Sequence, residues 1–181
     1  FFLIDDQIFN TEGIDYYPMV DDVQLKTFAI LPSLTENILI NVGFTTGLIA
    51  YALGLDQVKP IFPITGCIST FTFKFKPHRL INFEFFHNRG QVEIDAMFIE
   101  KRNGIDTLFI IEAKTDSFHK SLAKHKLLYP VLGIANHVPH VMPIVPVYLK
   151  IKTTPLGIHY HVTECSLPDP RQYMVSYDEI Q

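Results

Sequence analysis

The segment from Gln91 to Lys114 constrains the fold of this chain most strongly, because its pattern is that of a single β-hairpin. Small or apolar side chains occupy every second position of residues 92–99, as is typical of a strand. Residues 108–114 are an apolar run that ends in two charged side chains. Asn103-Gly104, between these runs, favours the positive φ angles of a two-residue turn. We therefore expect two antiparallel strands joined at this turn.

The turn also fixes which residues face each other across the hairpin. If Arg102 pairs with Ile105, every pair of residue numbers sums to 207. Asp95 then lies opposite Glu112, with the side chains about 5 Å apart on one face, and Lys114 follows on the same face. Facing carboxylates destabilise a sheet, so this pair needs a compensating cation, which is either a metal ion or Lys114 itself.

Carboxylate oxygens at this position favour Mg²⁺ or Mn²⁺ as the metal ion. Mg²⁺ takes one or two protein carboxylates and fills its other positions with water and phosphate oxygens. Asp95 and Glu112 could hold the ion, and the backbone carbonyl of Ala113 could add a ligand. Lys114 could orient or deprotonate a water that attacks phosphorus. The pattern predicts phosphodiester hydrolysis, whereas its simpler interpretation is a surface ion-pair cluster.

Asp95, followed by Glu112-Ala113-Lys114 on the next strand, resembles the D...(D/E)xK signature of the PD-(D/E)xK nuclease superfamily, which includes restriction endonucleases and Holliday-junction resolvases. The resemblance covers about residues 33–152. It implies an α/β fold with a restriction-endonuclease-like αβββαβ core, in which helices flank a mixed central sheet. It also implies a Mg²⁺-dependent nuclease site with Asp95 and Glu112 as metal ligands and Lys114 as the catalytic lysine.

The chain departs from the superfamily pattern at two places. Ile94 precedes Asp95, where the signature has proline. Many members carry a glutamine early in the helix that follows the lysine, but this chain has a basic run there. That difference leaves open which role of this helix can be carried over from the superfamily.

A basic helix is expected directly after Lys114. Asp116 or Ser117 can cap it, and it should run to about Leu128 and end before Pro130. The candidate nucleic-acid-binding residues on this helix are Lys120, Lys124, His125 and Lys126. Either they form a solvated face of an amphipathic helix, or they lie beside the metal site and bind a phosphate backbone.

Residues 38–55 are uncharged for 18 positions and imitate a membrane span. Ser33-Leu-Thr-Glu36 has the spacing of a capping box, which favours a buried helix of a globular protein instead. Relatives often carry an acidic ligand on the helix before the sheet, so Glu36 is a candidate metal ligand. Its capping role would explain it without chemistry.

Two phenylalanine-rich segments, residues 70–76 and 80–86, alternate as half-exposed antiparallel strands. Their aromatic faces are expected in the core rather than as a platform for stacked bases. The second strand should pair with the strand of Asp95 across a turn at residues 87–90. Glu84 is then either a further metal ligand or a solvated carboxylate.

The C-terminal third adds two strands joined as a hairpin, at residues 146–152 and 157–163, of which the first is expected to be the final strand of the core. His159 and His161 alternate with apolar residues on the second strand and are expected to be surface residues, because no third metal ligand lies nearby. Cys67 and Cys165 match no metal-binding spacing, so we expect free thiols and a reducing, cytoplasmic location.

The length of 181 residues predicts one domain, with an acidic extension at residues 1–32, the core at 33–152, and a strand and tail at 153–181. The net charge is −4, but six acidic residues and no Lys or Arg lie within residues 1–24, which leaves +2 for the rest. This small net positive charge predicts weak, salt-sensitive nucleic-acid binding that a homodimer or a further domain would strengthen.

Taken together, the sequence predicts a DNA endonuclease of restriction or repair type, with no membrane partner. The alternative is an inactive nuclease-fold module that binds nucleic acid or protein. Phosphate-loop, dinucleotide-binding and HExxH patterns are absent from the sequence, which argues against NTP-dependent, NAD-dependent and metalloprotease chemistry.

Overall fold

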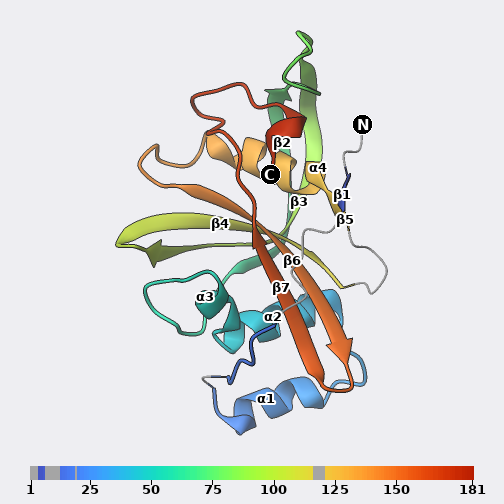
Figure 1. Cartoon of the computed structure of the whole chain (residues 1–181), viewed down its shortest axis with the longest axis vertical. Helices are drawn as coiled ribbons and strands as arrows, with labels where there is room; N and C mark the ends of the chain where they lie inside the picture. Colours follow the sequence, from blue (N-terminus) through green and yellow to red (C-terminus); the bar gives the residue numbers. More distant parts are fainter. Residues whose placement is uncertain (1–3, 7–12, 19, 116–120) are drawn as a thin grey trace.

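The computed structural model describes residues 4–6, 13–18, 20–115 and 121–181, and it has a mixed α/β fold built on an open five-stranded sheet (Figure 1). The strand order of this sheet is β2-β3-β4-β6-β7. The elements are β1 (Ile4–Asp6), α1 (Asp22–Ala29), α2 (Glu36–Thr45), α3 (Leu48–Ala52), β2 (Ile64–Phe75), β3 (Phe85–Arg102), β4 (Ile105–Lys114), β5 (Ser121–Ala123), α4 (Lys124–Ala135), β6 (Ile144–Thr154), β7 (Gly157–Glu164) and the short 3₁₀ helix η1 (Tyr177–Glu179).

The sheet is mixed because β4 and β6 run parallel, whereas its other neighbouring strands are antiparallel. A parallel pair needs a crossover, and the chain makes it through α4. The central strand β4 is buried on both faces from Thr107 to Ala113, which explains its continuous apolar run. The expected β6–β7 hairpin is confirmed, and β1 forms a separate two-stranded sheet with β5.

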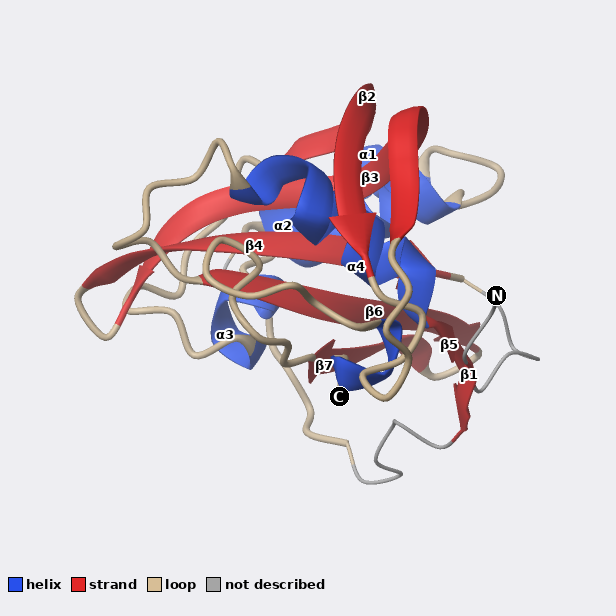
Figure 2. Ribbon diagram, turned by 90° about the horizontal axis from the view of Figure 1, so that it is seen from above, coloured by secondary structure: helices blue, strands red, loops and turns tan. Residues whose placement is uncertain are grey.

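Helices cover both faces of the sheet (Figure 2). On one face, Phe44 of α2 and Ile49 of α3 pack in a cluster with Phe98 and Phe109 of the hairpin. On the other face, Leu127 and Leu128 of α4 pack with apolar residues of β2, β6 and the C-terminal segment. Both faces of β4 are thus shielded from water, and only its ends are open.

The hairpin turn has the predicted geometry. Asn103 has φ 54° and Gly104 has φ 77°, and the pairs from Arg102–Ile105 to Ala96–Ile111 keep the sum of 207. Asp56 binds this turn through its side chain, a role that the sequence analysis did not predict. Its two carboxylate oxygens accept the backbone N–H groups of Asn103 at 2.7 Å and Gly104 at 2.8 Å.

Removing this carboxylate should loosen the turn. We expect Asp56→Ala to lower the free energy of unfolding by about 1 kcal/mol, because two charge-assisted hydrogen bonds at an exposed site are lost. Urea unfolding of the two proteins would measure the difference. Asp106→Ala, on the same hairpin, removes only a surface ion pair with Lys101 and is the control. Equal stabilities of Asp56→Ala and wild type would contradict the role of Asp56.

The predicted long helix over residues 33–55 is interrupted at Gly47, whose φ of 78° favours glycine. The N-cap of α2 is Thr35, and no side chain caps it. The capping box at Ser33 and Glu36 was therefore wrong, because the Glu36 carboxylate is bound elsewhere. None of the helices in the described part of the chain has the length and apolar character that a bilayer crossing requires.

The phenylalanine-rich segments form one long hairpin rather than three short strands. β3 continues through residues 87–90, where a turn was expected, and its partner along this length is β2. Phe75 pairs with Phe85 near the loop at residues 76–84. We call residues 70–90 the arm; it extends from the body at the top of Figure 1.

The helix after β4 lies later in the chain than predicted. Residues 121–123 form β5, and α4 runs from Lys124 through Pro130 to Ala135. The caps proposed at residues 116 and 117 lie outside the described residues. Proline at position 130 removes one helical donor, but the buried apolar residues on both sides of it hold the helix on the sheet.

Candidate active site

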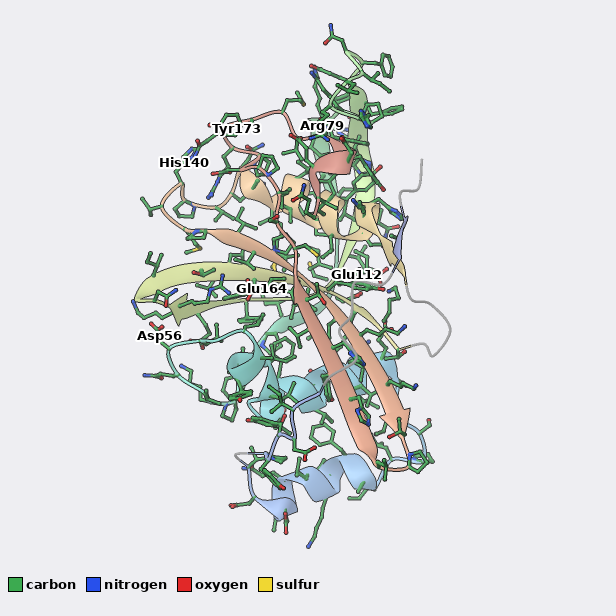
Figure 3. All side chains as sticks on the ribbon, in the orientation of Figure 1. Asp56, Arg79, Glu112, His140, Glu164 and Tyr173 are labelled. Atoms are coloured by element: carbon green, nitrogen blue, oxygen red, sulfur yellow. The ribbon has the colours of Figure 1, made fainter. Side chains whose placement is uncertain are left out.

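Asp95, Glu112 and Lys114 come together where β4 ends. Figure 3 labels Glu112 near the middle of the molecule. Glu112 is only 3% exposed, and its Oε1 lies 2.8 Å from Nζ of Lys114. The same ammonium donates a 2.7 Å hydrogen bond to the carbonyl of Ala113. The Lys114 side chain therefore folds back over its own strand and crosses the Ala113 peptide.

Asp95 binds the peptide group before that one. Its Oδ2 accepts the N–H of Ala113 at 2.7 Å; Asp95 lies one residue and Ala113 two residues beyond the last ladder pair, Ala96–Ile111. An aspartate side chain thus takes a hydrogen bond that a regular ladder would give to a backbone carbonyl. The two strands part at this point, and the side chains of the predicted pair lie on either side of the gap.

An irregularity in β3 explains why the strands part at Asp95. Ile94 packs with Val131 on the α4 face, whereas Ala96, two residues on, packs with Phe109 on the opposite face. The period-two alternation therefore breaks at Asp95. On the other side of β3, Gly66 stands between the paired residues Thr65 and Cys67 with a φ of 61°.

The carboxyl group of Glu112 is buried beside a second carboxylate, that of Asp95. Burial, reinforced by the neighbouring charge of Asp95, raises its pKa to about 7, although Lys114 and Lys126 act in the opposite direction. Its buried Oε1 lies 2.8 Å from the ammonium of Lys114. With a pKa of about 7, the carboxyl group is only partly ionised at neutral pH.

Lys114 is held as a cation. Its partial burial acts to lower the pKa, but the hydrogen bond and charge of Glu112, with Asp95 and Glu36, outweigh this effect, so the pKa is raised. A protonated ammonium donates hydrogen bonds and cannot accept a proton. Of the two roles predicted for Lys114, this environment favours orienting a water or phosphate oxygen over deprotonating a water.

Glu36 reaches the site from the first turn of α2. Its Oε2 accepts hydrogen bonds from the N–H of Thr115 at 2.9 Å and from the Thr115 hydroxyl at 3.1 Å. Glu36 therefore fixes the residue directly after Lys114, and its charge acts on the Lys114 ammonium. The alternative candidate, Glu84, is not brought to the site, because it lies on the arm and pairs with Lys74 at 3.1 Å.

The sequence missed Tyr148 as a neighbour of the site. It is the parallel-strand partner of Glu112 on β6 and is almost fully buried. Burial raises its pKa to about 12, so it is a neutral phenol next to the carboxylate. Nothing local in the sequence marks it, since the pairing of β4 with β6 crosses more than thirty residues.

The four basic residues predicted to bind nucleic acid differ in their surroundings. Lys124 is buried and donates to the carbonyl of Ile180 at 2.7 Å, so its expected role on an exposed phosphate-binding face was wrong. His125 is half-buried beside Tyr129, and burial lowers its pKa. Lys126 lies 3.7 Å from Glu93 and acts on Glu112, so it stays near the site. Lys120 lies outside the described residues.

The donors at the site suit a hard divalent cation. Within the described ranges, no three His, Cys, Asp or Glu side chains cluster as a complete metal site. Asp95, Glu112 and Ala113 offer two carboxylates and one carbonyl oxygen, which is the share of protein ligands that Mg²⁺ ordinarily takes. The burial of Glu112 beside the charge of Asp95 is the feature that favours a cation here.

Of the two histidines expected at the surface, His159 on β7 is exposed and lies 3.1 Å from the hydroxyl of Thr154. His161 is partly buried. Cys67 and Cys165 are free thiols, as predicted.

Comparison with known proteins places the chain in a family without assigning it an activity. A family model described as a domain of unknown function, DUF6997, matches residues 10–181. Neither a curated protein nor a solved structure gives a match. The chain therefore belongs to the DUF6997 family.

Proposed function

We propose that this DUF6997 domain hydrolyses phosphodiester bonds in nucleic acid with Mg²⁺ or Mn²⁺, as a DNA endonuclease of restriction or repair type on a PD-(D/E)xK-like core. The observation that carries the proposal is the arrangement around the backbone of one residue, Ala113. Asp95 holds its N–H, Lys114 holds its carbonyl, and the buried Glu112 lies beside both. The order of helices and strands also supports the proposal.

The residues that would hold the metal are Asp95, Glu112 and the carbonyl of Ala113. A bound Mg²⁺ or Mn²⁺ would supply the positive charge that polarises a phosphate and lowers the pKa of water. The protein contributes rigidity, because side chains bind both the N–H and the carbonyl of Ala113. Glu36 adds to this rigidity through its two hydrogen bonds to Thr115.

Lys114 and Glu112 have separate roles in the proposed reaction. The ammonium of Lys114 can donate a hydrogen bond to a phosphate oxygen or to the attacking water, and so stabilises negative charge as it develops. Glu112 has a pKa of about 7 in the metal-free protein, so at neutral pH it can give up its proton when it binds the ion. Lys126 is close enough to act on Glu112, and we assign it to a contact with a substrate phosphate.

Metal binding can be tested before any substrate is known. We expect millimolar Mn²⁺ to raise the midpoint of thermal unfolding of the wild type by about 5 °C or more, since it binds only the folded state. Asp95→Asn, which keeps the shape of the side chain, should lose most of this shift. An equal shift in both proteins would place the ion elsewhere and count against the site.

Cleavage is tested on supercoiled plasmid and on labelled single-stranded and double-stranded oligonucleotides. We expect Mn²⁺ or Mg²⁺ to permit cutting and EDTA to stop it. The alternative, an inactive module, is favoured by the fact that Lys114 already pairs with Glu112. Such a module would shift the mobility of DNA but leave every substrate uncut at any metal concentration.

A further inference from the structure

The arm presents aromatic side chains to solvent. Phe83 is 60% exposed and Phe86 is 57% exposed, whereas Phe73 and Phe75 lie in the core against Tyr129. The expectation that all of these phenylalanines are buried is therefore wrong for the outer ones. Figure 1 shows the end of the arm extending beyond α4 at the top of the molecule.

The arm is also basic, in contrast to the rest of the chain. Residues 70–90 contain four Lys or Arg and one acidic residue, Glu84, so they carry +3, while the other 160 residues carry −7. Arg89 is exposed, and the side chain of Arg79 is 69% exposed although it lies 3.3 Å from Asp178. Figure 3 places Arg79, which belongs to the arm, in the upper part of the molecule.

Strand β3 connects the arm to the site. Asp95, which is partly exposed, alternates with the exposed Glu93 and Gln91 on one side of β3. Arg89 follows at a β-bulge opposite Phe71 to Phe73, where its φ is 46°. Of the two carboxylates on this side of the strand, that of Glu93 is paired with Lys126 at 3.7 Å. Arg89 lies six residues from Asp95, which is at most about 20 Å of strand and matches about six stacked nucleotides.

We propose that the arm binds a single-stranded segment of the nucleic acid whose phosphodiester bond lies at Asp95 and Glu112. Bases stack on Phe83 and Phe86, and phosphates contact Arg79 and Arg89. Stacking on exposed phenylalanine needs unpaired bases, which favours a single strand over a duplex. This inference rests on the proposed function for the position of the bond, but the binding itself can be measured separately.

The test uses fluorescein-labelled dT12 and dT4 in EDTA, so that no cleavage interferes with the anisotropy measurement. For dT12 we expect Phe83→Ser with Phe86→Ser to raise Kd about tenfold or more, because each stacked base is lost. Arg79→Gln with Arg89→Gln should lower the slope of log Kd against log salt by about 1.4, for two phosphate contacts. The wild type should bind dT4, which is too short to join the arm to the site, more weakly than dT12.

Two variants outside the arm serve as matched controls. Phe62→Ser removes a phenylalanine that is 93% exposed on the loop before β2, and Lys26→Gln removes an exposed charge on α1, at the opposite end of the molecule. Both should bind dT12 like the wild type. Thermal unfolding of each arm variant within a few degrees of wild type would show that the fold is retained.

The outcomes separate this inference from the proposed function. If the wild type cuts DNA and the arm variants bind dT12 unchanged, the role of the arm is overturned and the nuclease stands. If the wild type binds dT12 through the arm but never cuts, the binding role of the arm stands and the nuclease fails. Arm variants that instead alter only sedimentation of the protein, or only its binding to anionic vesicles, would overturn the inference in favour of a second copy or a lipid surface.

Discussion

Lys114→Ala is expected to reduce metal-dependent cleavage about a thousandfold or more, the scale of losing a charged donor to the transition state. Two effects act together. The ammonium that would face the phosphate is lost, and the pKa of Glu112 should rise further, because Lys114 now acts to lower it. At pH 7 Glu112 would then be protonated and would no longer bind a cation. Cleavage rates at saturating Mn²⁺ would measure the loss.

Lys101→Ala is the matched control for this experiment. Lys101 belongs to the same hairpin, but it pairs with Asp106 on the surface, and its removal should leave the cleavage rate unchanged. Lys114 is half-buried at the end of its strand, so its truncation should leave the folded state intact by circular dichroism. A Lys114→Ala protein that keeps a tenth or more of the wild-type rate would remove this residue from the mechanism.

The hairpin could be predicted because its determinants are local. Asn103-Gly104 fixes the turn, and the register then follows from counting, as the pairs up to Ala96–Ile111 confirm. The departure at Asp95 could not be predicted in the same way. It depends on the change of face between Ile94 and Ala96, which is set by packing against helices distant in the chain.

Glu36 and Lys124 show how tertiary contacts override local rules. The spacing of Glu36 from Ser33 is that of a capping box, yet its carboxylate binds Thr115, 79 residues away. Lys124 looks like an exposed residue of a basic helix, yet it binds the carbonyl of Ile180. In both cases the partner is supplied by a different part of the chain, and no sequence periodicity encodes it.

The exposure of the outer phenylalanines of the arm was not predicted, because a phenylalanine at every second residue was assumed to indicate one buried face. On β2 that assumption holds for Phe73 and Phe75, which pack against α4 and the C-terminal segment. Phe83 and Phe86 lie beyond the reach of those elements and remain in water. The length of a hairpin relative to the body that covers it decides which aromatic residues are buried, and composition alone does not give that length.

The raised pKa of Glu112 makes the stability of the metal-free protein depend on pH. The folded state binds the Glu112 proton more tightly than the unfolded state, because its pKa is about 7 against an ordinary value of 4.5. The stabilisation of the folded state by this proton is fully present below pH 4.5 and is lost as pH rises through 7. The difference corresponds to about 3 kcal/mol of the free energy of unfolding at pH 8.

Glu112→Gln, an uncharged analogue of the protonated side chain, should therefore gain stability over wild type as pH rises. In EDTA we expect equal unfolding free energies near pH 4.5 and an advantage of about 3 kcal/mol for the variant at pH 8, measured by urea unfolding. Glu100→Gln, which breaks only a pair with Lys59, should show no such growth. Mn²⁺ should reverse the order at pH 8, because only the ionised carboxylate binds it. A difference between wild type and Glu112→Gln that does not change with pH would contradict a buried, charge-deficient carboxylate, and with it the reason to expect a metal ion.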